Sequence, residues 1–396
     1  MAMKFLMLVV VSLLFLSCTH QSSLKQVSSI RGVAESVYLT QNENNDPVLV
    51  WTEHTNDTLQ FFLSVSHDGG SSFKDRITVP LSKDVATHAE GMPKVAFKDG
   101  SIIIAYERKS PTEGNKYAGA IIYRSSNDGG KTWSEEKFLH SDTTAGRSRS
   151  YFDIERLANG EIGAAWLDTK LDEKTSGRSV RFATTRGNLE FGNELLIDSS
   201  ACQCCRIDLY SDVTGTVNVA YRGLAHGQMG QPIRDMMMTT SNNNGKTFTS
   251  PRKISQDNWM IDGCPHTGPS LCGSKSGLYS VWYTGGNGTG IFASFKRKGE
   301  SDFKNRKLIS SSGRQPQASV SDSRSIIVWQ EATGETGKKT TNVFCQVSDG
   351  IATTRECLSL AGSNASSPVV TQASDGFVVA FLMETWNGTG LFTKKL

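Results

Sequence analysis

An eight-residue motif that occurs three times constrains the fold of this chain more than any other feature. The copies at 66–73, 126–133 and 241–248 share the form Ser-x-Asp/Asn-x-Gly-x-x-aromatic. In such a turn the Asp or Asn side chain accepts hydrogen bonds from nearby backbone N–H groups, and Gly takes the left-handed conformation. A single copy would be an ordinary hairpin turn. Three copies, each beside strand-like segments, predict a repeated β-sheet unit.

A second repeat gives the number of units. A run of β-forming residues ends in a large aromatic residue at 51, 106, 166, 221, 282, 329 and 381, with steps between 47 (282 to 329) and 61 (221 to 282) residues. This spacing suits one four-stranded propeller blade per repeat. We therefore expect residues 24–396 to form a single all-β domain, a seven-bladed β-propeller. A six-bladed ring is the alternative if the first or last repeat is partial.

The last repeat stops at 391–393, one strand short of a blade. A blade without its outer strand would expose a sheet edge that could pair with other chains. We expect residues 24–28 to supply the missing strand, so that an N-terminal strand closes the last blade.

The N-terminal residues predict export and a lipid anchor. Lys4 precedes an apolar run at 5–16, which is too short to span a bilayer and is typical of a secretory signal. The segment 14–18 resembles the lipobox of bacterial lipoproteins, in which the Cys is diacylated. We expect a signal peptide at 1–17, lipidation of Cys18 and a polar tether at 18–23, with a plain cleaved signal as the alternative. Thr19, in place of an Asp that can retain lipoproteins at the inner membrane, favours the outer membrane and a periplasm-facing position.

The order of strands in a blade predicts where a site would lie. If the strands are named A to D from the channel outward, the eight-residue motifs lie in the C–D turns on one face. The D–A and B–C loops then surround the channel mouth on the opposite face, where we expect a ligand site. The net charge of +3 gives no concentrated basic face, so nucleic acid is not an expected partner. We expect a glycan, a small anionic ligand or an envelope protein. The candidate ligand-binding residues in these loops are Arg147, Arg149, Arg206, Arg222 and His266.

The cysteines are unusual for an exported protein. Seven remain besides Cys18, and an odd number cannot all pair within the chain. Cys345 and Cys357 flank the C–D turn of the sixth repeat, and we expect them to form a disulfide. The other five, Cys202, Cys204, Cys205, Cys264 and Cys272, lie in repeats four and five.

Three interpretations of this second group stay open. The cysteines could pair across two blades and leave one thiol over. Alternatively, a soft metal such as Cu(I) or Zn(II) could be held by Cys202, Cys204, Cys205 and Cys264 with His266 and His226. A redox-active or covalently modified thiol is the third possibility.

The eight-residue motifs match the Asp box, and the chain resembles the sialidase (neuraminidase) superfamily over essentially its whole mature length. The segments Cys202-Gln203-Cys204-Cys205, Tyr221-Arg222, Arg234-Asp235 and 262–269 look like those of a bacterial sialidase-like subgroup. The resemblance implies a three-arginine clamp for a substrate carboxylate, a Tyr nucleophile and an Asp acid/base. It would place the clamp among Arg31, Arg222, Arg234 and Arg314, and the acid/base at Asp168 or Glu107.

The chain departs from the sialidase pattern in three ways. The Arg-Ile-Pro signature is missing near Arg31, no Tyr in the last repeats suits the nucleophile, and we count seven repeats where sialidases have six blades. Asp boxes also occur in propellers that are not enzymes. We therefore expect a lipid-anchored binding module, and an exo-α-sialidase-type glycoside hydrolase is the alternative.

Overall fold

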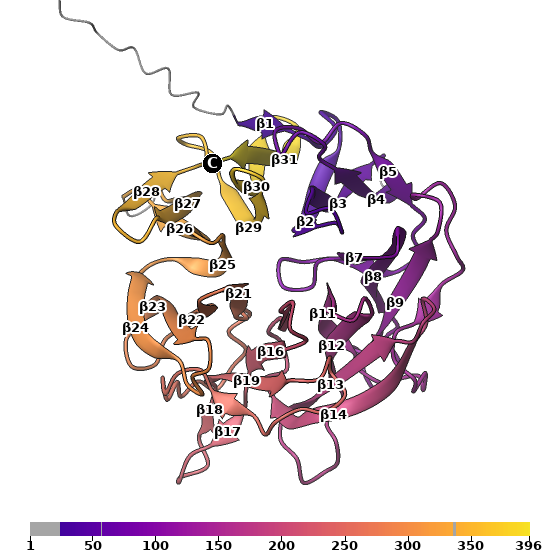
Figure 1. Cartoon of the computed structure of the whole chain (residues 1–396), viewed down its shortest axis with the longest axis vertical. Coiled ribbons are helices and arrows are strands. Elements are labelled where there is room, and N and C mark those ends of the chain that lie inside the picture. The colour runs from indigo at the N-terminus through magenta and orange to yellow at the C-terminus, as the bar shows by residue number, and fades with distance from the viewer. Residues whose placement is uncertain (1–23, 57, 336–337) are drawn as a thin grey trace, which may run out of the picture.

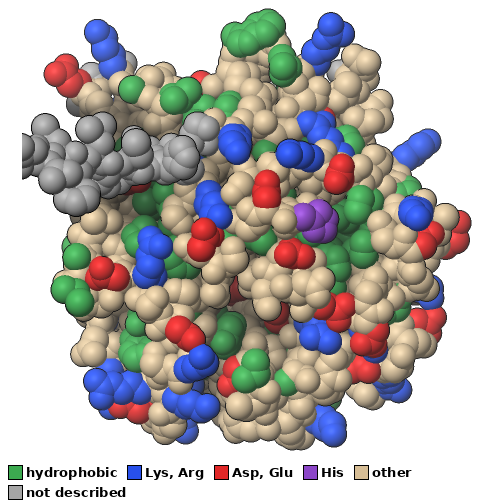
Figure 2. All heavy atoms as spheres, turned by 45° about the horizontal axis from the view of Figure 1, so that its top comes forward, with side chains coloured by type: hydrophobic (Ala, Val, Ile, Leu, Met, Phe, Trp, Pro, Cys, Tyr) green, Lys and Arg blue, Asp and Glu red, His purple; other side chains and the backbone are tan. Residues whose placement is uncertain are grey.

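The computed structural model describes residues 24–56, 58–335 and 338–396, and these form a seven-bladed β-propeller (Figure 1). Residues 1–23, including the predicted signal peptide and Cys18, lie outside the described residues. Within the described part of the chain, no helix has the length and apolarity needed to cross a bilayer. Lysines and arginines are interspersed with carboxylates over the face shown in Figure 2.

The first three blades follow one another along the chain. Blade 1 is β2 (Val33–Gln41), β3 (Pro47–Thr55), β4 (Thr58–Val65) and β5 (Ile77–Val79). Blade 2 is β7 (Lys94–Lys98), β8 (Ser101–Lys109), β9 (Gly119–Ser126) and β10 (Lys137–Phe138), and the short β6 (Val85–Ala86) also pairs with β8. Blade 3 is β11 (Ser150–Arg156), β12 (Ile162–Asp168), β13 (Arg178–Thr185) and β14 (Phe191–Ala201).

The remaining blades repeat the same order. Blade 4 is β15 (Asp208–Ser211), β16 (Val217–Arg222), β19 (Met236–Ser241) and β20 (Arg252–Lys253), with the hairpin β17 (Ala225–His226) and β18 (Pro232–Ile233) in its B–C loop. Blade 5 is β21 (Ser270–Ser274), β22 (Gly277–Thr284), β23 (Gly290–Arg297) and β24 (Lys304–Ser310). Blade 6 is β25 (Arg314–Val320), β26 (Ser325–Thr333), β27 (Thr340–Ser348) and β28 (Thr353–Cys357). Blade 7 is β29 (Ala365–Ala373), β30 (Gly376–Thr385), β31 (Gly388–Lys395) and β1 (Lys25–Gln26).

The N-terminal strand closes the ring. Lys25 and Gln26 of β1 pair antiparallel with Thr393 and Phe392 of β31, so the first described residues become the outer strand of the last blade. This pairing confirms the seven-bladed fold with an N-terminal closing strand and excludes the six-bladed alternative. It also covers the edge of β31 that would otherwise stay unpaired.

The repeated aromatic residues form the core between blades. All seven lie on the B strands and are fully buried, and they are Trp51, Tyr106, Trp166, Tyr221, Trp282, Trp329 and Phe381. Their neighbours come from two adjacent blades, as where Val48 and Val50 of blade 1 share a cluster with Tyr106 of blade 2. Because each cluster needs both blades, burial of the B strands stabilises the ring as a whole.

The Asp boxes lie in C–D turns, as predicted. In the first box the Ser66 hydroxyl accepts a hydrogen bond from Gly70 N at 2.8 Å, and Asp68 Oδ1 accepts one from Ser72 N at 2.8 Å. Gly70 has a φ of +85°, and a side chain there would collide with Val378 of the neighbouring blade. The motif therefore needs glycine for the turn and also for packing against the preceding blade.

Candidate functional site

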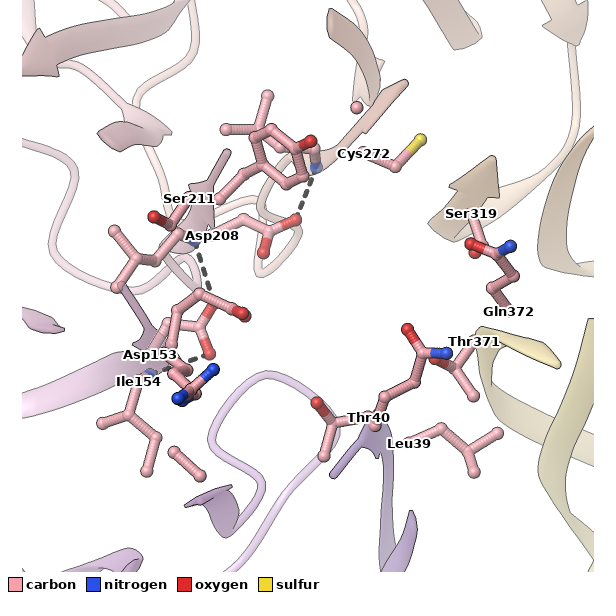
Figure 3. Close-up of a pocket in the computed structure, with 18 of the residues that line it drawn as sticks. Leu39, Thr40, Asp153, Ile154, Asp208, Ser211, Cys272, Ser319, Thr371 and Gln372 are labelled. Atoms are coloured by element: carbon pink, nitrogen blue, oxygen red, sulfur yellow. Dashed lines mark hydrogen bonds between the residues drawn. The ribbon is translucent and has the colours of Figure 1, made fainter. Parts of the chain in front are cut away.

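The seven A strands line a polar channel through the centre of the ring. It encloses about 430 Å³, and its lining includes A–B turn residues such as Asn42 and Asp212, so it opens on the face that carries the Asp boxes. Figure 3 shows Asp153 and Asp208 on one wall, facing Gln372 and Ser319 across the cavity. This cavity opens on the face opposite the one where we predicted a site.

Three carboxylates share one cation inside the channel. Lys94 Nζ lies 3.0 Å from Asp153 Oδ1, and Asp208 Oδ2 accepts a hydrogen bond from Leu271 N at 2.5 Å. Burial, followed by the nearby Asp153 carboxylate, raises the pKa of Glu155 and that of Asp208 to about 8. Both groups therefore hold protons at neutral pH for much of the time. Our sequence analysis missed this cluster, although the spacing of Asp153 and Glu155 by two residues on a strand places both side chains on one face.

The opposite end of the channel is closed. The loop between β6 and β7 reaches into the centre of the ring (Figure 1), where Glu90 Oε1 lies 2.5 Å from Arg206 Nη1. Glu90 also accepts a hydrogen bond from Gly268 N at 2.7 Å, and Arg206 donates to Pro316 O at 2.6 Å. These contacts connect blades 2, 4, 5 and 6 and leave a cavity of only about 10 Å³ at this end. Arg206, a candidate for ligand binding, is thus part of a plug.

Three cysteines come together beside the plug. Cys202, Cys204 and Cys205 lie in the connection from β14 to β15, and their thiols are the one group of three or more His, Cys, Asp and Glu donors within 4.8 Å of one another that occurs in the described chain. Cys202 Sγ is 3.9 Å from Cys204 Sγ and 3.8 Å from Cys205 Sγ. The three residues are 1%, 5% and 1% exposed. We call them the three-thiol cluster.

The structure brings together only half of the predicted metal ligands. Cys264, His226 and His266 are exposed and stand outside the three-thiol cluster, and Cys272 lines the central channel. All seven described cysteines are free, so the disulfide pairing across blades 4 and 5, one of the three open interpretations, is absent.

Arginines surround the three-thiol cluster. Arg234 Nη1 donates to Cys202 Sγ at 3.0 Å and to Gln203 Oε1 at 3.0 Å, and Arg178 Nη1 donates to Gln203 O at 3.3 Å. Hydrogen bonds from the thiols of Cys204 and Cys205, with the Arg234 charge, hold the pKa of Cys202 far below its usual range. Burial raises the pKa of Cys205 to about 12. Negative charge in the cluster therefore concentrates on Cys202.

Arg222 is not available to bind a ligand. Its side chain is 1% exposed and donates to three carbonyl oxygens, those of Thr267 at 2.9 Å, Arg234 at 2.9 Å and Tyr283 at 2.8 Å. The guanidinium also lies 4.8 Å from the centre of the Trp259 ring. Its donors hold the 254–269 loop in place.

The remaining buried candidates are paired with neighbours. Asp168 accepts from Trp166 Nε1 at 3.0 Å and from Arg149 Nε at 3.2 Å. Glu107 accepts from Tyr151 N at 2.6 Å, and burial raises the pKa of Glu107 to about 7. Tyr151 also packs against the three-thiol cluster, so this tyrosine connects Glu107 to the cluster.

The other candidate arginines are exposed and come from separate parts of the ring. Arg314, the first residue of β25, donates to Gly313 O at 2.9 Å, and its guanidinium lies 4.1 Å from the centre of the Tyr283 ring. Arg147 lies 3.9 Å from Asp142, and Arg31 lies between β1 and β2. Of the four arginines proposed for the carboxylate clamp, Arg222 and Arg234 are linked directly, through the backbone carbonyl of Arg234.

The predicted disulfide between Cys345 and Cys357 is wrong. Cys345 is opposite Glu356 and Cys357 is opposite Phe344, so the two cysteines are one residue out of register. Adjacent register positions point to opposite faces of a sheet. Accordingly, Cys345 is buried between blades and Cys357 is exposed. Their side chains cannot reach disulfide geometry without a shift of the strand.

Known proteins resemble this chain only in fold. No protein-family model and no curated protein matches the sequence. A protein of unknown function from Dyadobacter fermentans superposes with a TM-score of 0.52 at 13% identity, over 80% of this chain and 97% of that one. An α-L-arabinanase from Penicillium chrysogenum, complexed with arabinobiose, gives 0.51 at 14% identity over 81% and 93%. A leech intramolecular trans-sialidase gives 0.48 at 11% identity over 88% and 82%, which is too distant to carry an argument. The fold is thus shared with propeller glycoside hydrolases, and the similarity extends no further than the fold.

Proposed function

We propose that this protein is a lipid-anchored binding module of the bacterial cell envelope, in which the propeller holds a soft metal ion on Cys202, Cys204 and Cys205. The observation that carries the proposal is the spacing of the sulfur atoms. At a metal–sulfur bond of about 2.3 Å, tetrahedral bond angles separate two sulfurs by about 3.8 Å and trigonal angles by about 4.0 Å. The separations of 3.8 Å and 3.9 Å from Cys202 Sγ fall within this range.

The proposed export to the cell envelope is consistent with metal binding by these thiols. Thiols of exported proteins are normally oxidised, so without a metal ion we would expect two of the three cysteines to form a disulfide. The three thiols are buried and free instead. A bound ion would keep them reduced, because thiolates that are metal ligands are not available to attack an external disulfide.

The hydrolase alternative has no comparable observation in its favour. A carboxylate clamp requires guanidinium groups with free donors, whereas those of Arg222 are occupied by carbonyl oxygens. A glycan, a small anionic ligand or an envelope protein would instead meet exposed side chains such as Arg147, Arg314 and His266.

Metal analysis of the full-length protein tests the proposal. The protein is purified from the bacterial envelope without added chelator, and metals are counted per chain by mass spectrometry. We expect about one soft metal ion per chain, lost in the variant Cys202→Ser/Cys205→Ser and retained in Cys357→Ser, which removes an exposed thiol outside the cluster. Wild-type protein with no bound metal and three alkylatable or oxidised cluster thiols would refute it.

A further inference from the structure

We infer that the three-thiol cluster is a three-coordinate site for monovalent copper, Cu(I), in which Arg234 positions Cys202. The inference rests on the proposed metal binding and adds the identity of the ion, its coordination number and a residue that holds the site in shape. Three observations support it: the number of donors, their burial and the charges that face them.

The donor count argues against zinc. Structural zinc sites have four protein ligands, and catalytic ones have three with an open position for water. In the described chain no His, Asp, Glu or fourth Cys joins the three thiols. Tyr151 is the only apolar or aromatic side chain packed against the cluster among the described residues. Zinc would therefore lack a fourth protein ligand here.

Burial of the cluster also argues against an open coordination position filled by water, as catalytic zinc sites have. The three cysteines are at most 5% exposed, so a fourth ligand taken from solvent would have to enter a packed site. Cu(I) has no such requirement, because a soft ion is satisfied by thiolates alone. The sulfur separations of 3.8 Å and 3.9 Å lie between the tetrahedral and trigonal values given above, as expected for a three-sulfur site that is slightly pyramidal.

The surrounding charge favours an ion of low charge. Arg234 donates a hydrogen bond to Cys202 Sγ, Arg178 donates to the backbone oxygen of Gln203 in the same segment, and Arg222 donates to the backbone oxygen of Arg234. The surroundings of the cluster therefore already carry positive charge before any metal binds. The ion then adds its own charge to a buried site, and the cost of burying charge rises steeply from +1 to +2.

Arg234 is the positioning residue of this site. Its guanidinium bridges Cys202 Sγ and Gln203 Oε1, and its Nε donates to Ile261 O at 3.3 Å. These contacts fix the Cys202 side chain relative to the 254–269 loop. Hydrogen bonds to metal ligands from outside the coordination sphere typically change metal affinity by about 10- to 100-fold.

The binding step involves no redox change. Cu(I) forms three Cu–S bonds, and the thiols that are still protonated release their protons to solvent. The ion arrives as Cu(I), so neither an oxidant nor a reductant is consumed. Copper should therefore bind more tightly as pH rises, because fewer protons have to be displaced.

An anaerobic competition experiment tests the inference. Full-length protein is titrated with Cu(I) held by a chromophoric copper chelator, and separately with Zn(II) held by a zinc-binding dye, and the copper-loaded protein is measured by X-ray absorption. We expect one Cu(I) per chain with three sulfur ligands, and Cu(I) affinity at least 1000-fold above that for Zn(II), which corresponds to about 4 kcal/mol. Cys264→Ser should leave both results unchanged.

Variants separate the parts of the inference. Arg234→Gln should weaken Cu(I) binding by about 10- to 100-fold while the three-sulfur signature is retained; a residue with only a structural role would lower thermal stability without this change in affinity. Tighter Zn(II) binding, or a four-coordinate site that Cys264→Ser destroys, would overturn the copper assignment and leave the proposed function intact. If the protein binds neither Cu(I) nor Zn(II), both the copper assignment and the proposed metal-binding function are wrong.

Discussion

The two ends of the central channel differ in how completely their buried charged groups are paired. At the closed end Glu90 and Arg206 form a 2.5 Å ion pair, and their remaining donors and acceptors bind backbone groups of other blades. At the open end three carboxylates share Lys94, and burial raises the pKa of two of them, Glu155 and Asp208, to about 8. Buried charge that is fully paired holds the ring together, whereas charge that is incompletely paired can still respond to protons. The difference shows why residue type alone does not distinguish a structural charge from a functional one.

The largest expected effect is at the closed end. Glu90→Ala should lower the free energy of unfolding by about 3–5 kcal/mol, because it leaves Arg206 buried without its partner. Chemical denaturation monitored by tryptophan fluorescence measures the change. The control is Asp322→Ala, which breaks the exposed Lys275–Asp322 pair; a surface pair of this kind contributes little to stability. Equal losses in the two variants would mean that the plug is no more than a surface contact.

The channel carboxylates at the open end should make the free energy of unfolding depend on pH. Asp208 is neutral in the folded protein below about pH 8 and ionised in the unfolded chain above about pH 4, so the folded state binds more protons between these values. The stability contributed by this group is therefore complete at low pH and is lost as pH rises toward 8. Asp208→Asn keeps a neutral side chain at every pH.

The stability of the variant relative to wild type should accordingly increase from pH 5 to pH 8. The limiting slope is about 1.4 kcal/mol per pH unit, and coupling to Glu155 will make the observed slope smaller. Denaturation curves at four pH values measure it. Glu155→Gln should give a difference of the same sign. A difference that does not depend on pH would show that the channel carboxylates are ionised like those on the surface.

The repeats predicted the architecture because they are local. A Gly-rich turn and a buried aromatic residue at regular steps report a blade without knowledge of any distant contact, and the cluster of Cys202, Cys204 and Cys205 is local in the same sense. The plug was not predictable in this way. Glu90 and Arg206 are 116 residues apart in the chain, and only the path of the 88–92 loop decides that they meet.

The incorrect predictions have equally specific causes. Arg222 matches a carboxylate clamp by residue type, but the carbonyl oxygens of Thr267 and Tyr283 occupy its donors, and sequence does not show where those carbonyls point. The disulfide failed by a single position, because Cys357 pairs with Phe344 and not with Cys345. Register depends on the geometry of the turn, and one residue of error moves a side chain to the opposite face.

The smallest expected effect concerns two hydroxyl groups, one at each end of the channel. Thr267 Oγ1 at the closed end and Ser211 Oγ at the channel lining are both buried without a hydrogen-bond partner among the described residues. An unsatisfied buried hydroxyl costs about 1–3 kcal/mol, unless water reaches it. Ser211 lies in the lining of the open channel, where a small rotation of its side chain would expose the hydroxyl to water, whereas Thr267 lines neither the channel nor the cavity of about 10 Å³ at the closed end. Thr267→Val keeps the shape of the side chain and should raise the unfolding free energy by roughly 1 kcal/mol, whereas Ser211→Ala should stay within about 0.5 kcal/mol of wild type. Urea denaturation of the two single variants against wild type resolves a difference of this size. If Thr267→Val instead destabilises the protein, water must occupy the closed end, and the two ends would differ in their ion pairs and not in their hydration.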